Sequence, residues 1–174
     1  EIIKYKARMV AKGFMETFGV DFDQTFAPVA PLETIRASLI LGLQHDMHIF
    51  TGDVSTAFLY GKMKQPIWCE FPEGTEYKGF KYFCTDTAVY GFRQSPREWN
   101  KVFNEAILSA DPDIRRNRAD ASVYQIWKPD FKAIIVVYVD DILVLSTDSE
   151  WGEKFMTKLG DRFKFTWTPS ISLL

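Results

Sequence analysis

The sequence predicts an α+β fold. Strand-like and helix-like segments follow one another irregularly, without the regular strand–helix–strand repeat that builds a parallel sheet. Residues 32–43 carry apolar side chains at helical spacing, whereas residues 133–139 form a continuous apolar run typical of a buried strand. The chain has 174 residues, of which 47% are hydrophobic, and this is enough to bury the core of a single domain over residues 1–174.

The first third of the chain is predicted to form a strand, a loop, a helix and a second strand. In residues 4–10 charged and apolar side chains alternate, as in a strand with one face in water. Residues 18–31 are loop-like and close on two prolines, and the helix that follows is expected to end near residues 45–46. Residues 48–53 are predicted to be a short strand that runs into a tight turn.

A second helix is predicted to start at Ser95. The Ser95 hydroxyl can cap the helix, Pro96 suits the first helical position, and Glu98 completes a capping box. The polar stretch over residues 111–120 favours a loop and carries three arginines. These arginines fit a solvated charged surface at least as well as a phosphate-binding cluster.

Three further strands and a helix are predicted in the last third of the chain. Residues 123–127, 133–139 and 142–145 are rich in β-branched or aromatic side chains, which favours strands. A helix is expected after Thr147, because Glu150 lies three residues further on and completes a second capping box.

Two adjacent aspartates, Asp140 and Asp141, separate the last two predicted strands. Thirteen aspartates in 174 residues give about one such pair by chance, so the dipeptide alone is a weak motif. Its position between two apolar runs is more informative. A buried carboxylate costs several kcal/mol unless it is neutralised, paired or bound to a metal. A plain hairpin whose Asp-Asp turn is exposed to water remains an equal alternative.

Asp53 adds a third carboxylate at the end of the strand over residues 48–53. One aspartate at a strand end, beside a hairpin with two, would assemble hard oxygen ligands that suit Mg²⁺ rather than zinc. Two such ions, roughly 3.5–4 Å apart, can bind the attacking and leaving oxygens of an in-line phosphoryl transfer. Alternatively, Asp53 is the N-cap of a helical turn that begins at Val54. Spacing alone does not separate these two interpretations.

Composition argues against several other classes of protein. A net charge of −2 is not that of a uniformly basic nucleic-acid-binding protein, although a polymerase needs only a basic groove. Cys69 and Cys84 lack metal-binding spacing and are expected to be free thiols of a reduced, intracellular protein. No apolar stretch approaches the ~18–20 residues of a membrane span. Because the sequence does not start with Met, the chain is expected to begin inside a larger protein.

Six ordered blocks resemble the reverse transcriptase of copia-type LTR retrotransposons (Pseudoviridae). The block at residues 90–97, Tyr-Gly-Phe-Arg-Gln-Ser-Pro-Arg, is similar to the family's Tyr-Gly-Leu-Lys-Gln-Ala-Pro-Arg. The other blocks are residues 4–14, 25–30 and 53–61, Asp120 with Tyr124, and residues 138–141. Chance agreement over six blocks in the same order is negligible, and the resemblance extends to about residue 165.

The resemblance implies a right-hand polymerase: a palm with partial fingers, an antiparallel sheet with packed helices, and no thumb. It implies an RNA-directed DNA polymerase that uses two Mg²⁺ (or Mn²⁺) ions to transfer a nucleotide from a dNTP to a primer 3′-OH. Asp53 and Asp140 would be the principal metal ligands and Asp141 the more peripheral catalytic carboxylate, with the Val54 carbonyl completing the metal shell. Strand geometry agrees with this ranking, because neighbouring strand residues point to opposite faces.

Further positions match residues that bind nucleotide or nucleic acid in the family. Lys6 and Arg8 would contact the triphosphate, and the bulk of Phe58 would exclude a ribose 2′-OH. A solvated strand face for Lys6 and Arg8, and core packing for Phe58, are the alternatives. The implied nucleotide-binding residues are Lys6, Arg8, Ala57, Phe58, Tyr90 and Gly91, and the implied nucleic-acid-binding residues are Lys12, Arg93 and Arg97.

Two segments depart from the family pattern. Residues 84–87 stand where the family usually has Lys-Leu and a further Lys, which questions the local strand packing and a basic contact. Residues 166–174 do not follow the pattern, so a truncated or decayed copy is expected, less ordered at this end.

Three functions remain open on the sequence alone. The first is a reverse transcriptase domain. The second is a non-catalytic relic that keeps the fold and at most binds nucleic acid weakly. The third is another palm-type phosphotransferase, such as a nucleotide cyclase, against which the blocks at residues 4–14 and 90–97 argue. By resemblance the partners are a primed RNA or DNA template, dNTPs, and integrase and RNase H domains of a polyprotein, without a membrane, in cytoplasmic virus-like particles.

Overall fold

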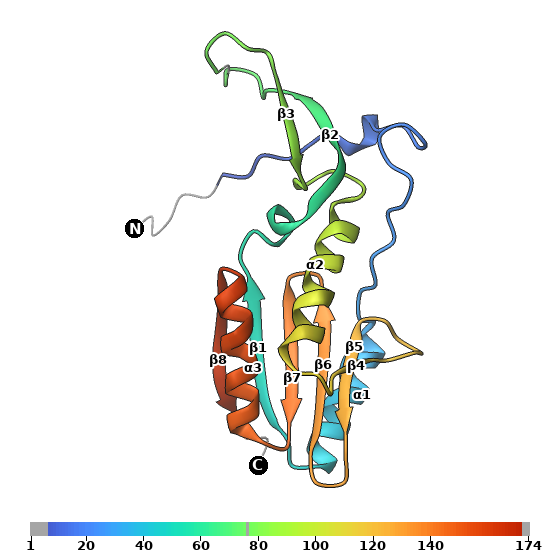
Figure 1. Ribbon diagram of the computed structural model, residues 1–174, viewed down its shortest axis with the longest axis vertical. Helices are drawn as coiled ribbons and strands as arrows, with labels where there is room; N and C mark the ends of the chain where they lie inside the picture. The colour runs from blue at the N-terminus through green and yellow to red at the C-terminus, as the bar shows by residue number, and fades with distance from the viewer. Residues whose placement is uncertain (1–6, 76, 172–174) are drawn as a thin grey trace. The chain divides into compact units, whose positions relative to one another are not determined.

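A computed structural model describes residues 7–75 and 77–171, which belong to two compact units (Figure 1). Unit 1 comprises residues up to Ala27 together with Phe58–Lys101, and unit 2 comprises Pro28–Ala57 together with Val102–Leu174. The α+β class is confirmed, since the described residues form three α-helices and mostly antiparallel strands. A single domain over residues 1–174 stays a prediction.

Unit 2 is built on a six-stranded antiparallel sheet in the order β4-β5-β6-β7-β1-β8. β6 and β7 form a hairpin closed by a two-residue turn, and β7 pairs on its other side with β1. The end of β1 therefore lies beside the hairpin turn. The strands are β1 (His48–Val54), β4 (Arg115–Arg116), β5 (Val123–Trp127), β6 (Lys132–Tyr138), β7 (Asp141–Ser146) and β8 (Phe165–Ile171).

Helices cover both faces of this sheet (Figure 1). α1 (Leu32–Gln44) packs on one face, where Gly42 lies against Leu145 of β7. α3 (Ser149–Arg162) packs on the other, where Gly152 lies against Phe50 of β1. The C-terminal half of α2 (Ser95–Ala110) lies beside α3, with the Phe103 and Phe163 rings 5.7 Å apart. Because both faces are covered, β6 is buried over five consecutive residues, which explains its unbroken apolar sequence.

The predicted elements of unit 2 are largely confirmed, with boundaries that agree within a residue or two for α1, β1, β5, β6 and β7. The cap of α3 differs from the prediction. Asp148 is the N-cap, and its carboxylate accepts hydrogen bonds from the backbone N–H groups of Glu150 and Trp151. The Thr147 hydroxyl bonds to β6 instead, accepting a hydrogen bond from the Lys132 backbone N–H at 3.1 Å.

Two strands of unit 2 were not predicted. β4 is only two residues long and is recognisable only by its pairing with β5. β8 begins where the family resemblance ends and pairs with the outer side of β1. β8 contains Pro169, which has no N–H to donate and is tolerated in an edge strand at a position that faces away from the neighbouring strand. Residues 172–174 lie outside the described residues.

Unit 1 contains the antiparallel pair β2 (Lys62–Glu70) and β3 (Tyr82–Thr87), the 3₁₀ helix η1 (Gly13–Met15) and the start of α2. A second 3₁₀ helix, η2 (Ala57–Tyr60), begins at the last residue of this part of unit 2 and continues into unit 1. The apolar core of unit 1 is formed by Met63, Ala88, Val89 and Phe92.

Three expectations for unit 1 are corrected or resolved. The strand predicted over residues 4–10 is wrong for residues 7–10, which are irregular and exposed, while residues 4–6 lie outside the described residues. The Ser95 hydroxyl donates to the Val89 carbonyl oxygen at 2.6 Å instead of capping α2. The atypical segment at residues 84–87 packs as part of β3, where Asp86 forms an ion pair with Lys62 at 3.2 Å.

Within the described ranges, no helix is both long enough and apolar enough to cross a lipid bilayer.

Candidate active site

Asp53 and Asp141 are direct cross-strand partners in the β1–β7 ladder. Opposite residues of an antiparallel pair project from the same face of the sheet, with Cβ atoms roughly 4.5–5.5 Å apart. Both side chains are exposed to solvent. Asp53 lies within β1 and the next helical turn begins only at Ala57, so the N-cap interpretation of Asp53 is wrong.

Asp140 lies in the turn between β6 and β7, beside this pair. Its backbone carbonyl oxygen accepts a hydrogen bond from the Val54 backbone N–H at 3.0 Å, which ties the turn to the end of β1. The preceding residue, Val139, has a φ of 58°. A β-branched residue rarely adopts this left-handed conformation, and such strain persists only where the surrounding structure imposes it. The turn that carries the carboxylates is therefore held in one defined, costly conformation.

The charges of the three aspartates affect one another. Partial burial raises the pKa of Asp141, and the negative charges of Asp140 and then Asp53 raise this pKa further. Each of these causes disfavours the ionised carboxylate. The end of the sheet therefore gathers mutually repelling negative charge, which a cation would relieve.

Hard carboxylate oxygens are the donors that Mg²⁺ and Mn²⁺ prefer, so the chemistry of this donor set fits the expected ions. In the part of the chain that the structure describes, however, no three His, Cys, Asp or Glu side chains are grouped so as to hold a metal ion. Asp140 and Asp141 are sequence neighbours, and neighbouring residues at a strand end point in different directions. Two ions at these three carboxylates, and the Val54 carbonyl as a ligand, remain predictions.

Three of the predicted nucleotide-binding residues come together in unit 1. The Arg8 guanidinium lies over the Tyr90 ring, 4.6 Å from its centroid. The Phe58 ring lies 4.7 Å from the Tyr90 ring, tilted by 53°. Tyr90 thus joins residues from three separate segments of the sequence into one cationic and aromatic cluster.

The backbone beside Tyr90 approaches residues 11–13 very closely. The Ala11 N–H donates to the Tyr90 carbonyl oxygen at 2.7 Å. Gly91 has a φ of 95°, and a Cβ at this position would lie 2.1 Å from the Ala11 carbonyl oxygen. A Cβ on Gly13 would in turn lie 2.0 Å from the Gly91 carbonyl oxygen. Only glycine fits at either position, and the predicted nucleotide-binding position Gly91 has at least this structural role.

The remaining predicted site residues have different surroundings. Ala57 is buried in η2. The Arg93 Nε–H donates to the Gly13 carbonyl oxygen at 2.7 Å, so Arg93 helps to build unit 1. The Arg97 Nε is buried and has no hydrogen-bond partner among the described residues. Lys12 is exposed, and Lys6 lies outside the described residues.

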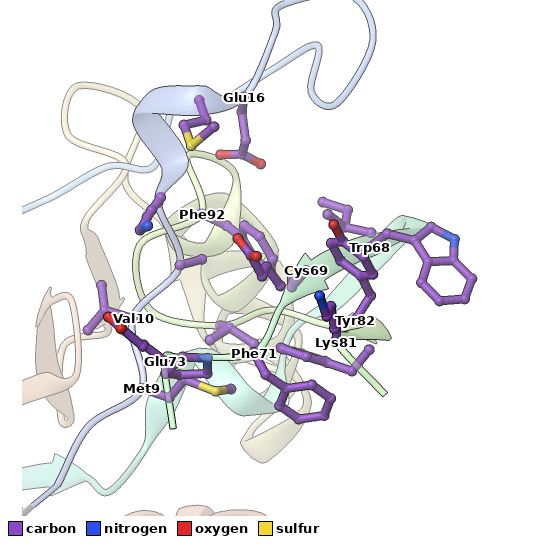
Figure 2. A pocket seen from close by; sticks show the side chains of 18 of the residues that line it. Met9, Val10, Glu16, Trp68, Cys69, Phe71, Glu73, Lys81, Tyr82 and Phe92 are labelled. Carbon is purple, nitrogen blue, oxygen red and sulfur yellow. The ribbon is translucent and has the colours of Figure 1, made fainter. Parts of the chain in front are cut away.

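Unit 1 also contains an open cavity of about 970 Å³ (Figure 2). Figure 2 shows Met9 and Val10 of the N-terminal segment, Cys69 and Phe71 of the β2 region, and Phe92 around it. Both basic and acidic side chains line the cavity, including Lys12, Lys81, Glu16, Glu70 and Glu73. Lys12 is the only predicted nucleic-acid-binding residue in this lining, and the acidic side chains do not favour phosphate over the whole surface.

The antiparallel sheet with aspartates at the meeting point of three strand ends defines unit 2 as an α+β scaffold with an acidic edge. A family model described as reverse transcriptase (RNA-dependent DNA polymerase) matches residues 1–173. The chain belongs to this family, whose members are nucleotidyltransferases, and the resemblance to the copia type is confirmed.

Plant transposon polyproteins are among its relatives. The chain is 35% identical over 151 residues to the retrovirus-related Pol polyprotein from transposon TNT 1-94 of Nicotiana tabacum, covering 85% of the chain and 11% of that protein. It is 31% identical over 162 residues to the corresponding polyproteins from transposons RE1 and RE2 of Arabidopsis thaliana, covering 92% of the chain. The chain spans only 11% of the length of each of these relatives.

Proposed function

We propose that the chain carries out the polymerase chemistry of a copia-like Pol polyprotein, transferring a nucleotide from a dNTP to a primer 3′-OH on an RNA or DNA template. The observation that carries the proposal is the Asp53–Asp141 cross-strand pair with Asp140 in the adjoining turn. In this proposal unit 2 is the palm and unit 1 a part of the fingers. The Pol polyprotein relatives support a place among other domains of a polyprotein, for which integrase and RNase H are the ones expected by resemblance.

Asp53, Asp140 and Asp141 would hold two Mg²⁺ or Mn²⁺ ions, with the Val54 carbonyl as a further ligand. When bound, these ions would stabilise charge on the attacking and leaving oxygens of the phosphoryl transfer. The chain's own contribution is to hold the carboxylates close together. The hydrogen bond from Val54 to the Asp140 carbonyl and the constrained Val139 backbone support this role, because they limit the positions that the turn can take.

Arg8, Tyr90 and Phe58 would bind the nucleotide. Stacking on Tyr90 limits the rotation of the Arg8 guanidinium and leaves its N–H groups free to donate to phosphate oxygens. Phe58, held against the same ring, would exclude a ribose 2′-OH by its bulk. The cluster therefore supports a preference for dNTPs over rNTPs.

One observation favours a non-catalytic relic as the second candidate. The described residues contain no group of three side chains arranged to hold a metal. A chain that has lost its metal site would keep the fold, and at most bind nucleic acid through phosphate contacts, which weaken steeply as salt rises.

Primer extension separates the two candidates. The chain is incubated with a DNA primer on an RNA template, dNTPs and Mn²⁺ at low salt, and addition of the first nucleotides is measured. The polymerase proposal predicts metal-dependent extension with dNTPs, much less with rNTPs, and a loss of about 100-fold or more in Asp140→Asn, because the reaction depends on charge stabilisation at this site. Binding of the primer–template without any nucleotide addition would favour the relic.

A further inference from the structure

Asp120 forms an unusually complete set of hydrogen bonds in unit 2, although sequence analysis gave it no role beyond membership of a family block. Its Oδ1 accepts from the Ser122 backbone N–H at 2.9 Å and from the Ser122 hydroxyl. Its Oδ2 accepts from the Thr34 hydroxyl at 2.6 Å. Thr34 lies in the first turn of α1 and Ser122 directly precedes β5, so one carboxylate joins two elements that are distant in sequence.

The segments that precede α1 and β5 also meet at Val137 of β6. The Val137 N–H donates to the Ser122 carbonyl oxygen at 2.9 Å, and the Val137 carbonyl oxygen accepts from the Ala30 N–H at 3.3 Å. Ala30, Ser122 and Val137 are each no more than 2% exposed, so water cannot readily replace these bonds. Ala30 leads into α1. The hydrogen bonds from Val137 to Ser122, Asp120 and Thr34, and from Ala30 back to Val137, are joined into a closed circuit by the backbone between Ala30 and Thr34.

This circuit adjoins the carboxylate turn, the two-residue turn at Val139 and Asp140 that precedes Asp141. Val137 is paired with Ile142 at the last step of the hairpin before Tyr138 and Asp141. On the far side of the hairpin, Asp140 accepts the bond from Val54 of β1. The end of the hairpin is thus fixed from one side by the circuit and from the other by β1. The position of Asp140 and Asp141 relative to Asp53 depends on both.

The segment that presents Asp120 is itself firmly held. The Asn117 side chain accepts from the Ala119 N–H at 2.8 Å and from the Asp120 N–H at 3.2 Å. The Arg116 Nε–H donates to the Ala121 carbonyl oxygen at 2.6 Å. Burial alone would raise the pKa of Asp120, but the hydrogen bonds from Ser122 and Thr34 outweigh it and hold the pKa below its usual range. Asp120 is therefore an ionised acceptor at neutral pH.

We infer that Asp120 is a positioning residue for the carboxylate turn: by closing the circuit through Thr34 and Ser122, it holds the end of the β6–β7 hairpin where Asp140 and Asp141 meet Asp53. Asp120 does not itself touch a reacting group. The expected effect of Asp120 on metal binding rests on the proposed function. The expected effect of Asp120 on the position of the turn does not.

The test compares variants that open the circuit with one that disturbs the other end of the same hairpin. Asp120→Ala removes the acceptor, and Thr34→Val removes only the hydroxyl with little change of shape. Asp148→Ala is the matched control, because the Asp148 carboxylate also accepts two backbone N–H bonds but lies beyond the far end of β7. Amide exchange by NMR is read at Val54 and Val137, whose N–H groups bond to the turn and to the circuit, and Mn²⁺ affinity is measured on the same samples.

We expect exchange at Val54 and Val137 to become about tenfold faster in Asp120→Ala than in Asp148→Ala at equal overall stability, with a smaller acceleration in Thr34→Val. Mn²⁺ affinity is expected to fall about 10-fold in Asp120→Ala and to be unchanged in Asp148→Ala, since partners that orient ligands typically change metal affinity on this scale. Equal exchange at Val54 in Asp120→Ala and Asp148→Ala would overturn the inference.

Two further outcomes keep the inference separate from the proposed function. If Asp120→Ala does not fold, Thr34→Val decides: unchanged exchange at Val54 in that variant overturns the positioning role. If the unaltered chain binds no Mn²⁺, the proposed polymerase function fails. Faster exchange at Val54 in the circuit variants would still support the role of Asp120 in holding the turn.

Discussion

Asp53 and Asp141 face each other across the β1–β7 ladder, although they come from the two separate segments of the sequence that form unit 2. Two carboxylates directly opposite in a sheet destabilise it, because like charges repel across adjacent strands. A pair of this kind is costly for folding alone and useful where a cation is to be bound.

Replacing Asp141 by Asn should stabilise the chain at pH 7 in the absence of divalent ions. The pKa of Asp141 in the folded state lies above its ordinary value of 3.8, so folding favours the protonated form. Its contribution to stability is therefore greatest below pH 3.8 and is lost as the pH rises through the raised pKa. Because the side chain is exposed and screened, the gain in free energy of unfolding at pH 7 should be about 0.5 kcal/mol or less.

Urea unfolding at pH 7 and pH 3.5 measures this effect. Asp130→Asn is the control, since the charge of Asp130 favourably affects Lys128 and its removal should not stabilise the chain. Asp141→Asn should be more stable than the unaltered chain at pH 7 and indistinguishable from it at pH 3.5. A loss of stability at pH 7 would mean that the Asp141 carboxylate makes a favourable interaction and is not repelled by its neighbours.

Replacing Val139 by Gly should not destabilise the fold. Val139 has a φ of 58°, which glycine adopts without strain, and this relief should offset the greater backbone entropy of glycine in the unfolded state. We expect a change between neutral and about 1 kcal/mol of stabilisation. Val123→Gly, in the buried strand β5, should instead cost about 2 kcal/mol or more. Thermal unfolding of both variants checks the contrast, and equal destabilisation would refute the strain assigned to the turn.

Replacing Gly91 by Ala should disrupt unit 1 far more than replacing Gly74 by Ala. Both glycines have a positive φ, 95° and 76°, so both substitutions cost about 1 kcal/mol of backbone strain. Only at Gly91 would the new Cβ collide with backbone, 2.1 Å from the Ala11 carbonyl oxygen, whereas nothing lies within 4 Å at Gly74. We expect a loss of about 3 kcal/mol or more for Gly91→Ala. Similar melting temperatures for the two variants would show that the segments at Ala11 and Gly91 do not pack as described.

Elements with a simple hydrophobic pattern could be predicted from the sequence. The apolar spacing of Ile35 and Leu39 marks α1, because these half-buried side chains pack against the core. The unbroken run at residues 133–137 marks β6, because it is buried over its whole length. The strands β2 and β3 were not predicted from the sequence. They pair chiefly with each other, and β2 carries exposed Lys64 and Pro66 and a shift in register, so burial imposes no continuous alternation on it.

For the candidate site, sequence could supply the residue types and the family, but not their pairing. Asp53 and the Asp140–Asp141 turn were expected to lie together, whereas the register that sets Asp53 opposite Asp141 depends on hydrogen bonds between strands distant in sequence. The circuit through Thr34 and Asp120 could not be predicted from the sequence for the same reason. Each of the two residues alone is an ordinary polar side chain, and their hydrogen bond joins segments that are distant in sequence. Whether Asp140 or Asp141 is the principal ligand stays a prediction.

The most direct test of the central claim is a Mn²⁺ titration followed by electron paramagnetic resonance, with the unaltered chain, Asp53→Asn/Asp140→Asn and Glu153→Gln/Asp161→Asn. Both double variants remove two negative charges, but Glu153 and Asp161 are exposed on α3 and belong neither to β1 nor to the β6–β7 turn. The account predicts Mn²⁺ binding to the unaltered chain and to the α3 variant, and a loss of affinity of about 100-fold or more in Asp53→Asn/Asp140→Asn, because carboxylates are the ligands that retain such ions. Equal Mn²⁺ binding by all three proteins would contradict it.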